Sequence, residues 1–363
     1  MSGPNVGGGG LGRYVEQLTG ELPRVDTKNR YVLFQPNIPW YTLKEQVALA
    51  PIIDQEKLDL VHFPHWNVPL FLKTPFVVTI HDLILLEEPR SARATTRHPL
   101  IYVFKYAGFK HVLAHAIRAS QKIIAVSSAT KSDILKHFPD VEKEKIVVIY
   151  EGVTDVSARA GNDPAEGNKG ASPLARRRDH FRHASPYLLY VGNCYPHKNL
   201  SMLLRAFDLL HPSFPDLHLV LAGRDDVFSR ALEQESKAFA SHPFCSFTRN
   251  PTDADLAALY AGARAYVFPS RIEGFGLPPL EAMTMHVPVA CSDIPSLREI
   301  LGDSAAYFSP NDPQHIAETI ARILRDETLR TMLIQKGNEQ VKKYTWTRMA
   351  HETVSVYQSC ERR

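Results

Sequence analysis

Short apolar runs that alternate with helical stretches occupy most of this chain. The alternation occurs once in the first half of the sequence and again in the second half. The runs are rich in Val and Ile and several end in a polar residue, as buried parallel strands do. In the first half they cover residues 31–35, 58–63, 76–82, 122–127 and 145–150, with helical candidates at 11–22, 100–119 and 128–137. Because strands that alternate with helices form parallel sheets covered on both faces, this half predicts a doubly wound α/β domain.

The alternation stops at residue 154 and restarts after residue 185. The stretch between is rich in Gly, Pro, Ala and charge, which is typical of a linker or mobile loop. Beyond it, strands are predicted at 187–192, 217–223, 265–270, 287–292 and 305–308, and helices at 200–210, 254–261 and 279–285. A chain of 363 residues also exceeds one ordinary core. We therefore expect Rossmann-like domains over residues 1–155 and 186–340, a linker or loop over 156–185, and a last segment over 341–363.

Charge and cysteine content limit which partners and which cellular location are expected. The net charge is only +3, which gives no support for a nucleic-acid partner. The four cysteines, Cys194, Cys245, Cys291 and Cys360, are scattered and form no C-x-x-C pair, which favours a reduced, cytoplasmic location. No apolar run approaches the ~20 residues that a membrane-spanning helix needs. Any membrane contact is therefore expected to be peripheral, at the inner face.

A glycine run near the start formally matches a dinucleotide-binding fingerprint. Gly7, Gly9 and Gly12 fit the pattern G-x-G-x-x-G, which would suggest an NAD-dependent dehydrogenase. That fingerprint requires a preceding strand and an acidic residue about 20 positions later. No strand fits between Met1 and Gly7, and the nearest acids come too early. Either the start is placed late or the sheet lacks that edge, and the match by itself is weak.

The strongest chemical signal is the segment Glu273-Gly-Phe-Gly-Leu-Pro-Pro-Leu-Glu281, which follows a predicted strand. Its glycines, Gly274 and Gly276, allow close backbone approach, and the prolines suit the start of a helix. The amide groups and dipole at a helix N-terminus favour an anion. Two carboxylates facing such a phosphate site could accept hydrogen bonds from sugar and ribose hydroxyls. The ordinary alternative is a loop with one capping and one exposed glutamate.

These motifs together resemble a known enzyme family over nearly the whole chain. The segments GGGGLGRYVEQL, TPFVVTIHDL, AVSSATKSDI, LLYVGNCYPHKNLSMLLRAF and FPSRIEGFGLPPLEAM are similar to those of retaining glycosyltransferases of family four, which have the GT-B fold. The resemblance implies two Rossmann-like domains facing across a cleft, the N-terminal one binding the acceptor and the C-terminal one the sugar nucleotide. It also implies that the last helix packs back on the N-terminal domain. It places Glu273 by the donor sugar ring and Glu281 on the ribose hydroxyls, with Gly274, Phe275, Gly276 and Leu277 lining the donor.

The segment VGNCYPHKNL carries the expected cation for the leaving diphosphate. A lysine beside a diphosphate neutralises the charge that grows as the glycosidic bond breaks, and we assign this role to Lys198. Similar enzymes often have an arginine where Asn193 stands, so here that position can donate a hydrogen bond but supplies no charge. His197 is expected to be an exposed loop histidine. For Lys198 alone, a solvated surface lysine would be the ordinary interpretation.

Two further candidates belong to the first domain. His81 and Asp82 end the strand PFVVTIHDL, at the carboxyl edge where open α/β sheets bind ligands. The resemblance places His81 near the reacting carbon of the donor sugar, with Asp82 as an orienting partner or strand-end cap. A histidine packed against a helix is the alternative. The end of the glycine run resembles the first loop of the family, whose backbone amides face the donor diphosphate or the acceptor, and Gly10 is the candidate there.

The sequence gives weaker signals for a nucleobase pocket, a metal site or a catalytic nucleophile. In similar enzymes the positions of Gly223 and Asn250 line the nucleobase pocket, through backbone groups. The pairs His62/His65 and His111/His115 lack a third ligand at a zinc-like spacing, so we expect no metal. Asp225 and Asp226 could suggest a cation site, but a GT-B enzyme needs none. No G-x-S-x-G elbow appears, and no cysteine has an obvious partner base.

The sequence thus predicts a metal-independent, retaining hexosyltransferase without a cofactor. Its substrates would be a GDP- or UDP-linked sugar, with some bias to mannose, and a hydroxyl of a glycan or lipid-linked glycan. Arg90, Arg93 and Arg97 precede a long apolar and basic helix over 100–119, which is either an ordinary core-facing helix or a membrane-surface element. A sugar-nucleotide epimerase and a non-catalytic sugar-nucleotide-binding homologue stay open as alternatives.

Overall fold

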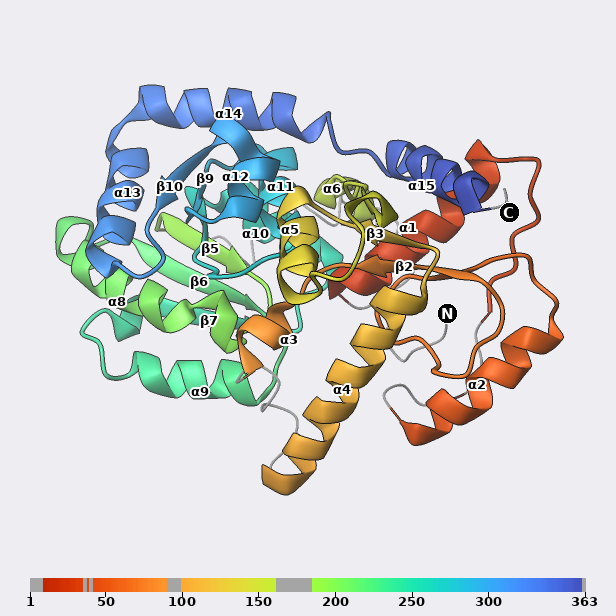
Figure 1. Cartoon of the computed structure of the whole chain (residues 1–363). Helices are drawn as coiled ribbons and strands as arrows, with labels where there is room; N and C mark the ends of the chain where they lie inside the picture. The colour runs from red at the N-terminus through yellow and green to blue at the C-terminus, as the bar shows by residue number, and fades with distance from the viewer. Residues whose placement is uncertain (1–8, 35–37, 39–41, 90–98, 161–184, 361–363) are drawn as a thin grey trace, which may run out of the picture. The chain divides into compact units, whose positions relative to one another are not determined.

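The computed structural model describes residues 9–34, 38, 42–89, 99–160 and 185–360. These residues form two compact units (Figure 1). Unit 1 comprises the described residues of 9–87, 99–152 and 344–360, and unit 2 those of 88–89, 153–160 and 185–343. The chain therefore returns to unit 1 for its last helix. Each unit has its own parallel sheet, which confirms the expected α/β class with two domains.

Unit 1 is built on a parallel sheet whose described strands run in the order β1-β2-β3-β4. They are β1 (Val61–Phe63), β2 (Phe76–Ile80), β3 (Lys122–Ala125) and β4 (Ile146–Val148). The helices are α1 (Gly9–Val25), α2 (Leu43–Gln55), α3 (Ile84–Glu87), α4 (Pro99–Ala119), α5 (Ser128–His137) and α15 (Trp346–Cys360).

Both faces of this sheet are covered, as the apolar composition of its strands requires. Successive residues of β2 point to opposite faces, so Val78 joins the core beneath α4 and α5 while Val77 joins the core beneath α1 and α15. In Figure 1 the helix α15 lies beside α1, although the two are separated by most of the sequence. Trp346 and Met349 of α15 are buried in the core that they share with Tyr14 of α1.

Unit 2 contains a longer parallel sheet, in which the described strands run in the order β10-β9-β8-β5-β6-β7. They are β5 (Tyr187–Val191), β6 (His218–Gly223), β7 (Cys245–Arg249), β8 (Ala265–Phe268), β9 (Val289–Ser292) and β10 (Ala305–Phe308). The helices are α6 (Val156–Ala160), α8 (Leu200–Leu210), α9 (Val227–Ser236), α10 (Asp253–Gly262), α11 (Leu277–Thr284), α12 (Pro295–Leu301), α13 (Pro313–Arg325) and α14 (Glu327–Val341). Within the unit, this is the strand order of a dinucleotide-binding Rossmann sheet.

Two expectations about strands were wrong. The run 31–35 was expected to be a strand, but Tyr31–Phe34 have no regular structure, and Val32 and Leu33 are 45 % and 51 % exposed. An apolar run becomes a strand only where a neighbouring strand pairs with it, and no described strand pairs with this one. Conversely, β7 was not predicted. It is a half-buried edge strand with a polar sequence, CSFTR, and lacks the apolar signal of the central strands.

Candidate active site

The sheet of unit 2 has a topological switch point between β5 and β8. From β5 the chain proceeds outward to β6 and β7, and it then crosses back to β8, β9 and β10 on the other side. Open α/β sheets bind ligands outside the carboxyl ends of the strands at such a point, because the loops from the two neighbouring strands diverge there. The loops that follow β5 and β8 are the ones that carry Lys198 and Glu273. Position in the fold thus selects the same two loops as the sequence motifs.

The loop after β5 is held in shape by its backbone conformation and by the side chains of two asparagines. Gly192 follows the strand, and the short 3₁₀ helix Pro196–Lys198 leads to Asn199, whose φ of 61° is left-handed. The side-chain Nδ2 atom of Asn199 donates to the carbonyl oxygens of Pro269 (3.1 Å) and Pro310 (2.7 Å). The Oδ1 atom of Asn193 accepts from the backbone N–H of Tyr195 at 3.3 Å. Asn193 therefore helps to shape the loop that ends at Lys198.

The loop after β8 leads into the N-terminus of α11. Gly276 stands at the N-cap with a φ of 95°, a conformation that favours glycine, and a Cβ there would lie 2.6 Å from Cδ2 of Leu297. Phe275 and Leu277 are buried, so their side chains anchor the loop, and only their backbone groups are suited to a donor. Gly274 is also buried in this turn. The expected order of loop glutamate, glycines and helical glutamate is confirmed: Glu281 lies in the first turns of α11.

Direct contacts join the two loops. The Nζ atom of Lys198 donates to Oε1 of Glu273 at 2.6 Å, and the two side chains are only 13 % and 10 % exposed. Arg271 supplies two more links, from its backbone N–H to the carbonyl of His197 (2.8 Å) and from Nη2 to that of Pro196 (3.2 Å). Lys198 is thus a largely buried, paired cation, which differs from the solvated surface lysine considered above.

His197 differs from its expectation. It is 5 % exposed rather than an exposed loop residue. Burial, and next the neighbouring Lys198 charge, lower the pKa of His197 to about 4, so the ring is neutral near pH 7. The turn of the 3₁₀ helix points this side chain inward, a detail that the loop sequence did not reveal. Lys198 therefore receives no help from a second positive charge at this position.

Glu281 has a cationic partner that sequence reasoning missed. Arg159, in α6, donates from Nη1 to Oε1 of Glu281 at 3.1 Å, and its Nε lies 4.0 Å from Oδ1 of Asp253. The side chains of Arg159 and Glu281 are 12 % and 7 % exposed. Arg159 falls in the stretch expected to be a linker, and no motif in the sequence around it marked it.

The other donor-binding candidates lie at the same edge of the unit 2 sheet. Gly223 ends β6, and a Cβ at this position would clash with the carbonyl oxygen of Gly192, so the two loops approach closely. Asn250 follows β7 with a φ of 48° and donates its backbone N–H to the carbonyl of Gly223 at 2.7 Å. The Oδ1 atom of Asn250 accepts from the N–H of Asp225 at 3.0 Å. Gly223, Asn250 and the loop of Asn193 therefore form one connected region.

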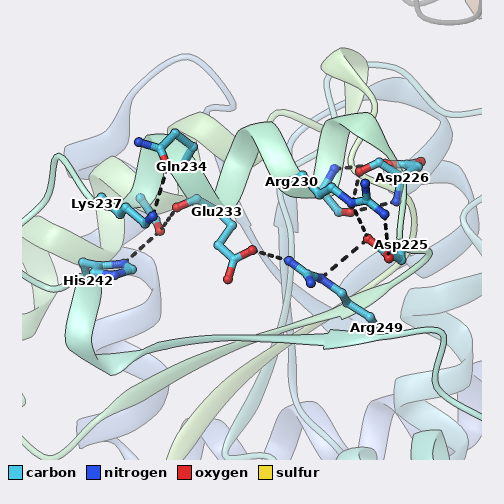
Figure 2. A network of polar contacts seen from close by, with 10 residues as sticks. Asp225, Asp226, Arg230, Glu233, Gln234, Lys237, His242 and Arg249 are labelled. Atoms are coloured by element: carbon cyan, nitrogen blue, oxygen red, sulfur yellow. Dashed lines mark hydrogen bonds and ion pairs between the residues drawn. The ribbon is translucent and has the colours of Figure 1, made fainter.

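The acidic pair Asp225–Asp226 is engaged in local contacts (Figure 2). Asp226 caps α9, accepting from the N–H groups of Phe228 and Ser229 at 2.9 Å. Asp225 binds Arg230 through two bonds of 3.0 Å and lies 3.6 Å from Arg249, which also pairs with Glu233. These contacts give both carboxylates a structural role at the start of α9.

The described residues also bear on two other kinds of chemistry, a metal site and a reactive thiol. Over residues 9–34, 42–89, 99–160 and 185–360, no three His, Cys, Asp or Glu side chains gather as metal ligands. Burial raises the pKa of Cys194, in the loop after β5, to about 12, which keeps the thiol protonated near pH 7.

In unit 1, His81 lies at the carboxyl end of β2 with hydrogen-bond acceptors on both ring nitrogens. Nδ1 is 2.8 Å from Oε1 of Glu151, and Nε2 is 2.9 Å from the carbonyl oxygen of Pro64. Burial by itself would lower the pKa of His81, but the hydrogen bond and charge of Glu151 outweigh it and raise the pKa above its usual value. A carbonyl and a carboxylate both accept, so this arrangement favours the doubly protonated, cationic ring. No motif indicated Glu151, which accounts for this shift.

A chain of hydrogen bonds lies behind His81. The ring of Tyr14 packs edge-on against that of His81, and its hydroxyl is 2.9 Å from Oγ1 of Thr79. Oγ1 of Thr79 is 2.8 Å from Nε2 of His62, whose Nδ1 is 2.6 Å from the hydroxyl of Tyr357 in α15. Burial lowers the pKa of His62 to about 3. His62 is therefore a neutral, half-buried histidine that joins β1 to the last helix.

Asp82 is a strand-end cap: its Oδ1 accepts from the backbone N–H of Ile84 at 3.0 Å, at the start of α3. Gly10 lies in the first turn of α1, so the expected loop is helical there. The physical reason is the apolar face of this segment, which packs Tyr14 and Leu18 into the core from the first turns onward. Residues 1–8, including Gly7, lie outside the described residues, while Gly9 and Gly12 are both within α1.

The helix α4 has a second half that faces the core and a first half that exposes apolar side chains. Its second half packs Leu113, Ala116 and Ile117 into the core, whereas Val103 and Phe104 in its first half are 59 % and 77 % exposed. Arg90, Arg93 and Arg97 lie outside the described residues. No helix in the described part of the chain is long and apolar enough to cross a membrane.

A cavity of about 860 Å³ lies elsewhere in unit 1, beside β1 and the segment of Tyr31 and Phe34. Its lining includes His62 and Tyr357 but none of the candidate site residues. The candidate site residues of unit 2 lie at the switch point of its sheet, and His81 lies at the end of β2 in unit 1, so neither set is part of this cavity.

Two family models match the chain and together cover most of it. The model for glycosyltransferase family 4 matches residues 8–157, and the model for glycosyl transferases group 1 matches residues 173–340. The chain is 30 % identical over 307 residues to O-antigen chain mannosyltransferase B of Escherichia coli, covering 82 % of this chain and 74 % of that one. It is 27 % identical over 310 residues to O-antigen chain mannosyltransferase RfbU of Salmonella typhimurium, covering 85 % and 76 %. It spans only 34 % of the Escherichia coli serotype-specific mannosyltransferase WbdA, to which it is 29 % identical over 300 residues.

Solved structures share the fold at low sequence identity. Sucrose-phosphate synthase from Thermosynechococcus elongatus superposes with a TM-score of 0.71 at 20 % identity, covering 97 % of this chain and 94 % of that one. Anabaena Alr3699/HepE in complex with UDP-glucose gives a TM-score of 0.69 at 16 % identity, covering 90 % and 86 %. At these identities the likeness establishes the fold, which is the GT-B fold.

Proposed function

The chain belongs to glycosyltransferase family 4, and on that premise we propose that it is a retaining, metal-independent hexosyltransferase. It transfers a sugar, for which we favour mannose, from a GDP- or UDP-linked donor to a hydroxyl of a glycan or lipid-linked glycan. The observation that carries this proposal is the pair Lys198–Glu273, which joins two loops at the switch point of the unit 2 sheet. The names of the curated relatives, which are O-antigen mannosyltransferases, support the choice of sugar and acceptor.

In this proposal, unit 2 binds the donor. The lysine ammonium has three N–H groups, and the Glu273 carboxylate takes one, which leaves others for the diphosphate. The N-terminus of α11, opened by Gly274 and Gly276, offers backbone N–H groups to the same anion. Glu273 accepts from a hydroxyl of the donor sugar, and Glu281 accepts from the ribose. Gly223 and Asn250 contribute backbone groups to the nucleobase pocket.

The chemistry follows from these roles. The bond between the anomeric carbon and the diphosphate oxygen breaks, and the acceptor oxygen bonds to that carbon on the same face. The acceptor proton passes to the leaving phosphate, so the protein needs no nucleophile and no metal ion. Lys198 and the helix N-terminus stabilise the negative charge that develops on the diphosphate, which is commonly the largest catalytic contribution. His81 of unit 1, with its raised pKa, supplies a fixed positive charge and an oriented ring near the reacting carbon.

The acceptor is assigned to unit 1. The exposed apolar side chains in the first half of α4, among them Val103 and Phe104, would suit peripheral contact with a membrane that carries a lipid-linked acceptor. A cytoplasmic location, with the protein at the inner membrane face, is the corresponding prediction.

A binding screen tests the proposal. The purified chain is incubated with EDTA and with GDP-mannose, UDP-glucose, UDP-N-acetylglucosamine or NAD, and its thermal unfolding is recorded. A ligand at 100-fold over Kd should stabilise the folded state by about 2.7 kcal/mol. One sugar nucleotide should stabilise the wild type, and Glu281→Ala should lose that shift. Glu339→Ala, at an exposed pair with Lys342, should retain it.

Incubation of the bound donor with and without a glycan acceptor separates the alternatives. Transfer with release of the nucleoside diphosphate supports the proposal, and NMR of the product anomer tests retention. Conversion of the sugar nucleotide alone would indicate an epimerase. Binding without any reaction would indicate a non-catalytic homologue, and stabilisation by NAD alone would contradict the proposal.

A further inference from the structure

Arg159 is an unusual arginine because it is largely buried while part of its hydrogen-bonding capacity is unused. Nη1 donates to Glu281 at 3.1 Å. Nε and Nη2 are inaccessible to solvent and have no hydrogen-bond acceptor among the described residues. Buried donors without acceptors cost free energy and are rare in folded proteins, so each such group calls for an explanation.

The surroundings of Arg159 hold it at this position. Its helix, α6, packs against α10, and Asp253 at the start of α10 lies 4.0 Å from Nε. Glu281, its other partner, projects from α11. The guanidinium is therefore fixed by two carboxylates from two helices, although one direct hydrogen bond accounts for only part of its donors.

Glu281 and Arg159 form a largely buried ion pair. The Glu281 side chain is 7 % exposed, and burying a charge costs free energy that a close opposite charge offsets. Ribose hydroxyls are neutral and could not replace the cation. We therefore expect Arg159 to stay beside Glu281 when a donor binds, rather than to be displaced.

From this geometry we propose that Arg159 is a donor-binding residue that forms, with Glu281, a paired recognition site for the ribose diol. The inference rests on the proposed function, in which Glu281 binds the ribose. Each hydroxyl can donate its proton to the carboxylate and accept, through its oxygen, from a guanidinium N–H group that lacks an acceptor, once a small rotation of the Arg159 side chain turns that group toward the diol. The pair thereby binds the diol both as a hydrogen-bond donor, to Glu281, and as a hydrogen-bond acceptor, from Arg159. A nucleotide without those hydroxyls leaves both charged groups incompletely satisfied, so the site selects ribonucleotides.

The test is a comparison of ligands that differ only in the diol. Isothermal titration calorimetry of the full chain uses GDP and UDP to find the one that binds, and then its 2′,3′-dideoxy counterpart. Arg159→Met keeps the aliphatic stem and removes the donors. We expect it to weaken binding of the ribonucleotide about 10- to 100-fold, the range for hydrogen bonds to charged groups. For the dideoxy ligand, which already binds the wild type less tightly, the same substitution should change affinity by less than about 3-fold.

Two further variants separate a binding role from a general loss of structure. Arg159→Lys keeps the charge beside Glu281 but loses the forked geometry, and its affinity should fall between those of the wild type and Arg159→Met. Arg330→Met breaks a more exposed arginine–glutamate pair in α14 and should bind both ligands as the wild type does. Thermal unfolding of each variant confirms that it is folded before titration.

Each other result overturns the inference. Equal losses for the ribo and dideoxy ligands would mean that Arg159 acts on another part of the donor. Unchanged or tighter binding in Arg159→Met would mean that the arginine merely occupies Glu281 until a donor replaces it. If the wild type binds a nucleoside diphosphate and loses it in Glu281→Ala but not in Arg159→Met, the proposed function survives and this inference fails. If the wild type binds neither GDP nor UDP, both fail.

Discussion

Lys198 and Glu273 are separated by 75 positions in the sequence, yet Nζ of one lies 2.6 Å from Oε1 of the other. They come from the loops after β5 and β8, the two neighbouring strands at which the unit 2 sheet reverses its order. This contact explains how a lysine is kept largely buried in a loop: the carboxylate compensates for its lost hydration. It also places one positive and one negative group where a parallel sheet binds its ligand.

The first prediction concerns the charge at Lys198. Lys198→Ala should lower kcat for sugar transfer on the order of 100- to 1,000-fold, because the leaving diphosphate loses a positioned cation. Steady-state kinetics with saturating donor and acceptor measures this loss. Lys342→Ala, at an exposed pair with Glu339, serves as the control and should leave kcat unchanged. An unaltered kcat in Lys198→Ala would remove Lys198 from the mechanism.

The second prediction concerns the proton on His81. Glu151→Gln retains a hydrogen-bond acceptor for Nδ1 but removes the negative charge, so the pKa of His81 should fall. NMR titration of selectively labelled histidine follows this pKa directly. The exposed Glu142→Gln is the matched control and should leave the titration of His81 where it is. A midpoint that does not move in Glu151→Gln would show that another group protonates the ring.

The same pair gives a pH dependence of stability with a definite sign. The pKa of His81 is raised in the folded protein, so its contribution to the free energy of unfolding is fully present below about pH 6.5, the pKa of an unperturbed histidine. That contribution is lost as the pH rises through the folded-state pKa. Glu151→Gln should therefore be destabilised most below pH 6.5 and approach the wild type at higher pH. Urea denaturation at several pH values measures the difference, and a deficit that grows with pH would contradict it.

The third prediction concerns the turn before α11. Gly276→Ala introduces a Cβ at a φ of 95° and 2.6 Å from Leu297, so it should cost about 1–3 kcal/mol of stability and weaken donor binding. Gly108→Ala, in the interior of α4 with nothing within 4 Å of the new Cβ, should instead stabilise by roughly 0.5–1 kcal/mol. Thermal unfolding of the two variants should thus give shifts of opposite sign. Shifts of the same sign would show that the turn tolerates a side chain.

The fourth prediction concerns the link between α15 and β1. Tyr357→Phe leaves Nδ1 of the half-buried His62 without its 2.6 Å partner and should cost about 1–3 kcal/mol. Tyr106→Phe, whose hydroxyl makes no hydrogen bond to the described residues, is the control and should change the unfolding midpoint little. A loss no larger than that of the control would mean that water satisfies His62.

Acid should destabilise the folded protein through the same histidine, His62. Burial lowers the pKa of His62 to about 3, so between about pH 6.5 and pH 3 the unfolded chain binds a proton there that the folded protein does not. Stability should therefore fall as the pH decreases through this range. His62→Gln should flatten that part of the curve, and a slope identical to that of the wild type would assign the acid sensitivity to other groups.

Local sequence determined the strands whose signal is carried by their own residues. The run AAYF became β10 with the expected bounds, and β5, β6, β8 and β9 lie within the segments expected for them, because continuous apolar composition is what a buried parallel strand requires. The motif from Glu273 to Glu281 likewise specified its turn and helix start, since glycine and proline act through their own backbone. These features depend on neighbours in sequence, so the sequence alone revealed them.

Tertiary structure decided what depends on partners distant in sequence. Tyr31–Phe34 are apolar yet form no strand, and the polar β7 is a strand, because pairing and not composition made the difference. His197 turned inward, and Glu151 and Arg159 took positions beside His81 and Glu281, from segments that carried no motif. The charge state of a site is set by burial and by the nearest opposite charge, and both arise only when the chain is folded. The sequence thus indicated candidate groups for the reaction, while the fold selected the partners that fix their charges.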